Sequence, residues 1–443
     1  MTLALEALGW VIFLLGIGIS IGLHEIGHLV PAKRFGVKVT QYMIGFGPTV
    51  WSKHTPETEY GIKAVPVGGY IRMIGMYPPE KGADPTMLRA SSTGRFRTLI
   101  DDARQASLEE VTPADADRVF YKLPVRKRVV IMLGGPFMNL ALAFVLFTIV
   151  ISVIGTPQVT TTVGRVVPCV PTATSLKGAT NSDGTCTPST KTPAVLGGLL
   201  AGDTILSFDG TTVDTWEQAQ DAIKSAQPGP VPVVVQRGEE QLTLTLPLQT
   251  VTIPVLDDAG KPTGETEKRN FVGVAPGSER QTQPVTAVPA YIWDTTVRSV
   301  TTLVKLPVLV WNLARQTFTD EPRDPNGILG PVGVGRITGE VVALENTPVA
   351  DKVAGVLGLL AGLNLFLFLF NLIPLLPLDG GHVAGALWEA VKRAWAKVRR
   401  KPDPGPVDIA KALPVTYVVS LALLVMGAVT LLADLVKPIT LGG

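Results

Sequence analysis

Hydrophobic residues gather in four long runs along the chain, and alternating or polar stretches lie between them. The runs cover residues 5–30, 129–154, 353–376 and 413–436. A helix needs about 20 residues to cross the hydrocarbon core of a bilayer, so each run predicts a membrane span. The first run is interpreted as a retained span: no basic residue precedes it, no small-residue cleavage site follows it, and it contains His and Glu.

A fifth stretch, residues 291–318, is apolar but interrupted by charge. Its charged side chains are Asp294, Arg298, Lys305 and Arg315. They disfavour a span and predict an amphipathic helix lying in the membrane interface.

Composition supports a membrane protein with a soluble portion. Only 17% of the residues are charged, whereas soluble proteins carry about 25%. The net charge of +2, without a basic stripe interleaved with aromatic residues, argues against nucleic acid as a partner.

Basic residues near the span ends predict the orientation. Lysines and arginines follow the first span, precede the second and cluster at residues 392–401, while the N-terminal tail has none. We therefore expect residues 33–128 and 377–411 in the cytoplasm. Residues 155–352 and both termini are expected outside, in a multi-pass protein of the cell (plasma) membrane.

Two regions predict β-structure. Alternating apolar residues and paired glycines at 42–74 indicate a cytoplasmic-side β-hairpin, either a substrate-binding edge or an ordinary surface hairpin. The polar segment that follows contains a possible amphipathic helix near residues 95–111. Residues 159–250 read as an extracytoplasmic β-rich domain.

The turn-and-strand pattern at 202–210, Gly-Asp-x-Ile followed by Asp-Gly, resembles that of a PDZ domain. The resemblance implies a groove for an extended peptide near residues 197–200; a spacer without a ligand is the alternative. Cys169 and Cys186 lie on the expected outer side, where they could form a disulfide or remain two thiols.

The first run contains His24, Glu25 and His28. On a helix the two histidines lie one turn apart on one face, so both imidazoles can bind one metal ion. Glu25 beside them can accept a proton from a water that the metal activates. The motif predicts a zinc-hydrolase site within the membrane, and it needs a third ligand.

Asp379 follows the third run, where Pro374 and Pro377 end the helix. The first and third spans run in the same direction, so their C-terminal ends lie at the same membrane face. His24 lies roughly 24 Å along its span, at a matching depth. Asp379 is therefore predicted to complete a site of two histidines and one carboxylate, with an open position for water.

Three motifs together resemble the site-two protease family of intramembrane zinc metalloproteases, in particular its bacterial regulated-intramembrane-proteolysis branch. They are H-E-x-x-H at 24–28, G-P-x-x-N at 135–139 and N-x-x-P-x-x-x-L-D-G at 371–380. The likeness covers nearly the whole chain. It differs from some relatives in having one PDZ-like module and a cysteine-containing insert at 169–186.

The resemblance implies that His24, His28 and Asp379 bind Zn²⁺ and that Glu25 is the catalytic base. It also implies substrates that are single-span membrane proteins, such as anti-sigma factors, cleaved after their outer domain has been trimmed.

Two asparagines and two further histidines lie outside this set of three ligands and one base. Asn371 and Asn139 are candidates for binding the substrate backbone or the oxyanion, and Asn139 could equally hold two helices together. His54 and His382 are not expected to be ligands, although His382 could contact one.

The expected organisation follows the spans. It comprises a first transmembrane helix with the metal motif (1–32), a cytoplasmic hairpin and loop (33–128), a second helix (129–155), a PDZ-like domain (156–252), an extracytoplasmic linker with an interfacial helix (253–352), a third helix with the third ligand (353–382), a basic cytoplasmic loop (383–412), and a fourth helix with the tail (413–443).

Two rival functions are a non-catalytic PDZ membrane scaffold, which does not need Glu25, and an intramembrane metal transporter, which usually repeats its ligands in inverted halves.

Overall fold

The structure, a computed structural model, describes residues 2–78, 111–170, 186, 191–256, 262–345 and 347–441. The possible amphipathic helix at 95–111 falls almost wholly outside these residues. The chain divides into two compact units, residues 1–154 with 284–443 and residues 155–283.

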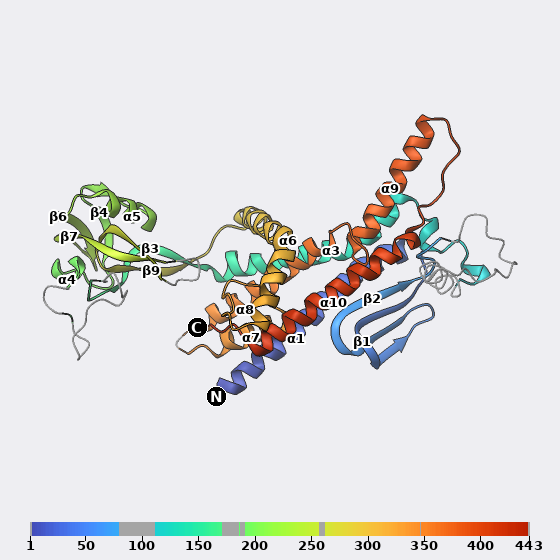
Figure 1. The fold of residues 1–443 in the computed structure, drawn as a ribbon, viewed down its shortest axis with the longest axis horizontal. Coiled ribbons are helices and arrows are strands. Elements are labelled where there is room, and N and C mark those ends of the chain that lie inside the picture. Colours follow the sequence, from blue (N-terminus) through green and yellow to red (C-terminus); the bar gives the residue numbers. More distant parts are fainter. Residues whose placement is uncertain are drawn as a thin grey trace. The chain divides into compact units, whose positions relative to one another are not determined.

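The first unit combines helices with a small β-sheet (Figure 1). Its elements are α1 (Thr2–Arg34), β1 (Val39–His54), β2 (Glu59–Met73), α3 (Val125–Thr148, continued by a π-helical segment to Ile154), α6 (Val288–Phe318), α7 (Pro331–Ala343), α8 (Val349–Asn371), α9 (Asp379–Val398) and α10 (Leu413–Val436). Among the residues that the structure describes, four helical segments are long and apolar enough to cross a membrane: residues 3–34, 125–154, 349–371 and 409–436. The predicted polytopic helical architecture is thereby confirmed, whereas the interfacial position of α6 stays a prediction.

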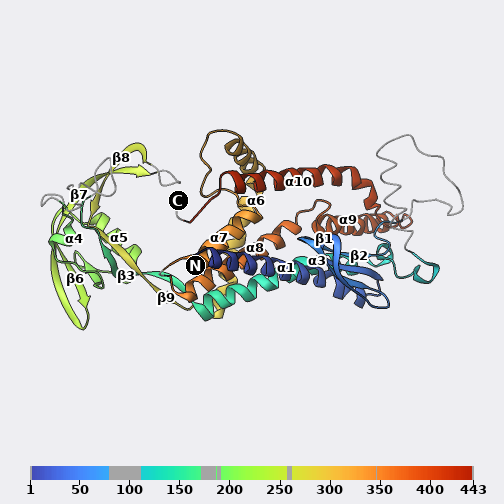
Figure 2. The same ribbon diagram turned by 90° about the horizontal axis from the view of Figure 1, so that it is seen from below.

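Glycines bring α1 and α3 into backbone contact. A Cβ added to Gly27 would lie 2.2 Å from the carbonyl oxygen of Gly134, and one added to Gly134 would lie 1.9 Å from that of Gly27. Small residues permit such close approach between helices in membranes. The two helices therefore run side by side (Figure 2).

The turn between α8 and α9 is equally tight. A Cβ on Gly380 would lie 2.3 Å from the carbonyl oxygen of Ile373, and one on Gly381 would lie 2.5 Å from the backbone nitrogen of Leu376. Only glycine fits at either position. After this turn a new helix, α9, begins at Asp379. It occupies part of the range where a third span and a basic loop were expected.

Strands β1 and β2 form a curled antiparallel sheet within the predicted hairpin region. The first half of β1 pairs on both sides, because Tyr42 lies opposite Ile71 on one side and opposite Tyr60 on the other. Gly45, Gly47 and Gly68 adopt positive φ, which permits the sharp bends.

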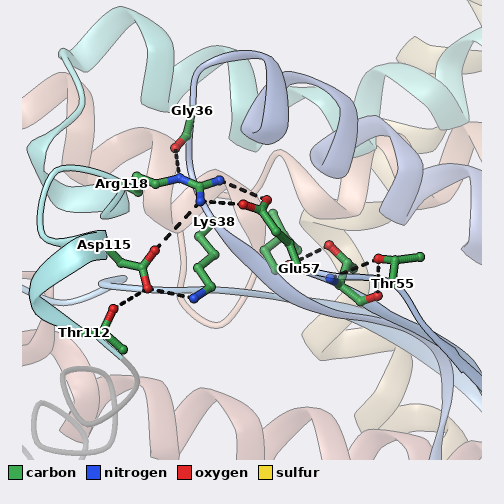
Figure 3. A network of polar contacts seen from close by, with 9 residues as sticks. Gly36, Lys38, Thr55, Glu57, Thr112, Asp115 and Arg118 are labelled. Atoms are coloured by element: carbon green, nitrogen blue, oxygen red, sulfur yellow. Dashed lines mark hydrogen bonds and ion pairs between the residues drawn. The ribbon is translucent and has the colours of Figure 1, made fainter.

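A polar network fastens residues 112–118 to the chain around this sheet (Figure 3). Lys38 Nζ and Thr112 Oγ1 each donate to Asp115 Oδ2 at 2.7 Å. Arg118 donates two parallel hydrogen bonds to Glu57, at 2.6 and 3.0 Å. The hydrogen bond from Lys38, and to a smaller extent the one from Thr112, lowers the pKa of the Asp115 carboxyl and keeps it charged.

The second unit is a β-rich domain. Its elements are β3 (Thr156–Val166), α4 (Pro193–Leu196), β4 (Thr204–Phe208), β5 (Thr211–Thr212), α5 (Trp216–Ser225), β6 (Gly229–Arg237), β7 (Glu240–Leu256), β8 (Pro262–Phe271) and β9 (Val274–Gln281). The strand order is β8-β7-β6-β4-β3-β9, with β5 beside β4. Strands β8 and β9 fall in the range expected to be a linker, so this unit continues beyond residue 252.

The structure shows what Asp203 and the two cysteines contact in the second unit. Asp203, of the Gly-Asp pair, is buried, accepts from Leu200 N–H at 2.9 Å and receives two 2.7 Å hydrogen bonds from Arg237. Cys169 and Cys186 are joined by a disulfide.

Candidate metal centre

The histidine pair is presented by one face of α1. His24 and His28 lie one turn apart, and their Nε2 atoms are 3.2 Å from each other. His28 is buried, and its Nδ1 is 2.7 Å from the carbonyl oxygen of Ile131 in α3. If Nδ1 carries the proton and donates it there, the Nε2 lone pair remains available to a metal ion.

Asp379 reaches the pair from the start of α9. Its Oδ2 atom is 3.3 Å from His24 Nε2 and 3.4 Å from His28 Nε2. The three ligand atoms thus form a nearly equilateral triangle. Tetrahedral zinc with bonds of about 2.0–2.1 Å requires ligand atoms roughly 3.3–3.4 Å apart. The donor set and its spacing therefore fit a zinc ion with a fourth position for water or substrate.

Helix α3 closes one side of the triad. A Cβ on Gly135 would lie 2.2 Å from His28 Nε2 and 2.7 Å from His24 Nε2, so only a glycine permits this packing. Gly135 opens the G-P-x-x-N motif, and its position gives that motif a steric reason.

Glu25 is buried on α1, next to His24 in the chain, with 8% of its surface exposed. The sheet approaches it from another side: a Cβ on Gly69 would lie 3.0 Å from Glu25 Cγ. The backbone of β2 at Gly69 therefore lies against the Glu25 side chain.

The asparagines differ in their surroundings. Asn139 is buried, and within the described part of the chain its Oδ1 has no hydrogen-bond partner. Asn371 is partly buried and donates to the carbonyl oxygen of Leu367, four residues earlier in its own helix.

Another polar pair escaped the sequence analysis. Asn364 of α8 is fully buried and donates to Ser20 Oγ of α1 at 2.9 Å. Ser20 lies one turn before His24, so this bond ties the histidine helix to α8. The sequence signal that could have found this pair is the presence of a polar residue inside each of two apolar runs, Ser20 in the first and Asn364 in the third.

The remaining histidines are not part of the triad. His54 is exposed and lies 3.6 Å from Glu59. His382 lies three residues after Asp379 on α9, and its Nδ1 is buried without a hydrogen-bond partner among the described residues.

Comparisons with known proteins agree with this site. Residues 12–402 match peptidase family M50. The chain is 33% identical to zinc metalloprotease Rip1 of Mycobacterium bovis (strain BCG / Pasteur 1173P2), with 98% of each chain covered. It is 26% identical to metalloprotease MmpA of Caulobacter vibrioides, with 86% of each covered, and 24% identical to zinc metalloprotease RasP of Oceanobacillus iheyensis, with 86% and 90% covered.

The family match spans most of the chain, and the relatives share its length and carry the name of a metal-dependent protease. These findings set aside a non-catalytic scaffold and a metal transporter. Together with four helices able to cross a membrane, they show that the chain belongs to the M50, or site-two protease, family and is a multi-pass intramembrane zinc metalloprotease.

Proposed function

We propose that this protease cleaves the transmembrane segments of single-span membrane regulators, such as anti-sigma factors, in regulated intramembrane proteolysis. The observation that carries the proposal is the convergence of His24, His28 and Asp379 beside Glu25, at the ends of helices that cross a membrane. A peptide bond that reaches this point belongs to a membrane segment.

In this mechanism His24, His28 and Asp379 hold the zinc ion. Zinc, when bound, supplies Lewis-acid activation of water and of the scissile carbonyl. Glu25 takes the proton from the attacking water and later gives it to the leaving amine. Asn139 and Asn371 are both candidates for a hydrogen bond to the substrate or oxyanion, because the bond from Asn371 to Leu367 uses only one of the two N–H donors of its amide.

A transmembrane helix hides its peptide bonds, so the substrate must unwind before cleavage. We propose that the unwound segment pairs with the strand at residues 69–73, which is the outer neighbour of β1 in the sheet and lies against Glu25 at Gly69. Extended backbone placed there would bring its carbonyl groups toward the triad.

The orientation proposed from basic residues puts both termini and the second unit outside the cell and the metal site near the cytoplasmic face. The second unit, taken as PDZ-like, would then admit only substrates whose outer domain has already been trimmed. Leu196, just before the segment 197–200 proposed to lie near the peptide groove, and Leu200, its last residue, are half exposed.

The test is the Glu25→Gln variant, purified and reconstituted with a single-span membrane substrate. We expect it to keep one zinc per chain and to lose cleavage, while Glu217→Gln, at an exposed position in the second unit, cleaves like the wild type. Normal cleavage by Glu25→Gln would refute the role of Glu25. The same variant should trap trimmed single-span proteins from membranes; recovery of intact multi-span proteins alone would contradict the substrate class.

A further inference from the structure

Helix α9 has an apolar outer face that the described residues of its own unit leave exposed. Five large side chains on this face are each more than half exposed. They are Leu387, Trp388, Val391, Trp395 and Val398. Figure 1 shows the C-terminal part of α9 projecting away from the other helices.

The opposite face of α9 is seated on protein. Ala386 and Glu389 are buried, and Glu389 accepts a hydrogen bond from Arg128 of α3. At 100° per residue, Val391 lies about 200° around the helix from Glu389. The helix is therefore held by Glu389 with Val391 on the side opposite to α3.

Basic residues flank the apolar face. They are Lys392, Lys397, Arg399, Arg400 and Lys401, whereas Arg393 pairs with the buried Glu389; residues 390–401 contain no acidic residue. Lys392 Nζ lies 5.7 Å from the ring centre of Trp388, and the Arg399 guanidinium lies 4.4 Å from that of Trp395. Each tryptophan thus carries a cation over its ring, and aromatic and basic side chains are both typical of the level of lipid headgroups.

The place of α9 in the chain limits what can cover this face. It follows α8, a span that ends at Asn371, and it precedes α10, so it starts at one surface of the membrane. A second copy of the chain would bring a like-charged helix against it. An anionic bilayer surface matches both its apolar residues and its charge.

We propose that α9 is an interfacial helix that binds anionic phospholipids, with Trp388 and Trp395 between the headgroups and the flanking lysines and arginines on the lipid phosphates. This surface lies outside the proteolytic chemistry and does not depend on the proposed substrate.

The test uses the full-length zinc-loaded protein in nanodiscs that contain phosphatidylcholine and a minor fraction of phosphatidylglycerol. Tryptophan emission is measured with bromine on the acyl chains of one lipid or the other, at equal mole fractions. The difference between the wild type and Trp388→Phe/Trp395→Phe gives the contribution of α9. We expect brominated phosphatidylglycerol to quench this contribution at least about twofold more than brominated phosphatidylcholine.

A charge-removal variant, Lys392→Gln/Lys397→Gln/Arg399→Gln, keeps every tryptophan and should bring the two quenching values together. Lys224→Gln/Lys268→Gln/Arg269→Gln removes the same charge from the second unit and should retain the preference. Equal quenching of the wild type by both lipids would overturn the proposal. Absence of quenching by either lipid would also overturn it, and crosslinking between copies through Val391→Cys would then identify a second chain as the occupant.

Discussion

Arg128 and Glu389 are 261 residues apart in the chain and form a buried ion pair, with Arg128 donating to Glu389 Oε1 at 2.5 Å. Glu389 also forms an ion pair with Arg393 at 2.9 Å and accepts a hydrogen bond from Val407 N–H at 3.0 Å. Because Asp379 begins the helix that carries Glu389, the pair joins the third metal-binding candidate to α3.

Removing the carboxylate should be costly, because Arg128 would remain buried without its partner. We expect Glu389→Ala to lower the free energy of unfolding by about 3–5 kcal/mol, measured as chemical or thermal unfolding in detergent. The double variant Arg128→Met/Glu389→Met should recover most of this loss. As a control, Asp294→Ala, which breaks the exposed pair with Arg298, should cost under about 1 kcal/mol.

Gly135→Ala should disturb the metal site directly, because its methyl group would overlap His28 Nε2. We expect kcat/KM to fall about 100-fold with reduced zinc content, since displacement of a site by about 1 Å has effects of that size. Gly18→Ala is the matched control, since a Cβ at Gly18 would have open space around it. Equal activity of the two variants would contradict the packing described for α3.

Metal removal should destabilise the first unit, because the proposed ligands come from α1 and α9 and a bound metal stabilises only the folded state. A chelator should lower the Tm of the wild type, and added zinc should restore it. His28→Ala should show little response to the chelator. A wild-type Tm that does not change on chelation would argue against zinc binding by this triad.

The second unit should show an acid-sensitive contribution from Asp203. Hydrogen bonding from Arg237 lowers the pKa of the Asp203 carboxyl, so its stabilisation is present above the unfolded value of about 3.9 and is lost as the pH falls through the lower folded value. Asp203→Asn should cost about 1–3 kcal/mol at pH 7. Hydrogen exchange of the second unit should show this, and the variant should then lose less stability than the wild type between pH 7 and acid.

Local sequence signals located the apolar helices and the three side chains that the structure brings together, His24, His28 and Asp379. Length and hydrophobicity are properties of a segment alone, and the spacing of His24 and His28 fixes a shared helix face. Asp379 followed from the direction of two spans, which requires no packing detail. Segment hydrophobicity, helical spacing and span direction can each be deduced from the sequence without knowing which helices pack against one another.

Other features depend on how helices meet, which periodicity does not encode. The bond from Asn364 to Ser20 and the pair of Arg128 with Glu389 arise from the rotation of each helix about its axis. For Asn371 the motif predicts substrate binding, which stays a prediction, and the structure adds one hydrogen bond from its amide to the Leu367 carbonyl in its own helix. The extension of the second unit to β9 was also missed, because a strand pair distant in sequence leaves little local pattern.

The pairing of β3 with β9 has an architectural consequence. Thr156 lies opposite Gln281, so the chain enters and leaves the second unit at neighbouring points. Opposed residues in an antiparallel pair are about 5 Å apart, a gap that a short turn can bridge. The β-rich unit is therefore an inserted domain whose two ends lie close together. Recombination could exchange or remove it without changing the path of the membrane-spanning helices.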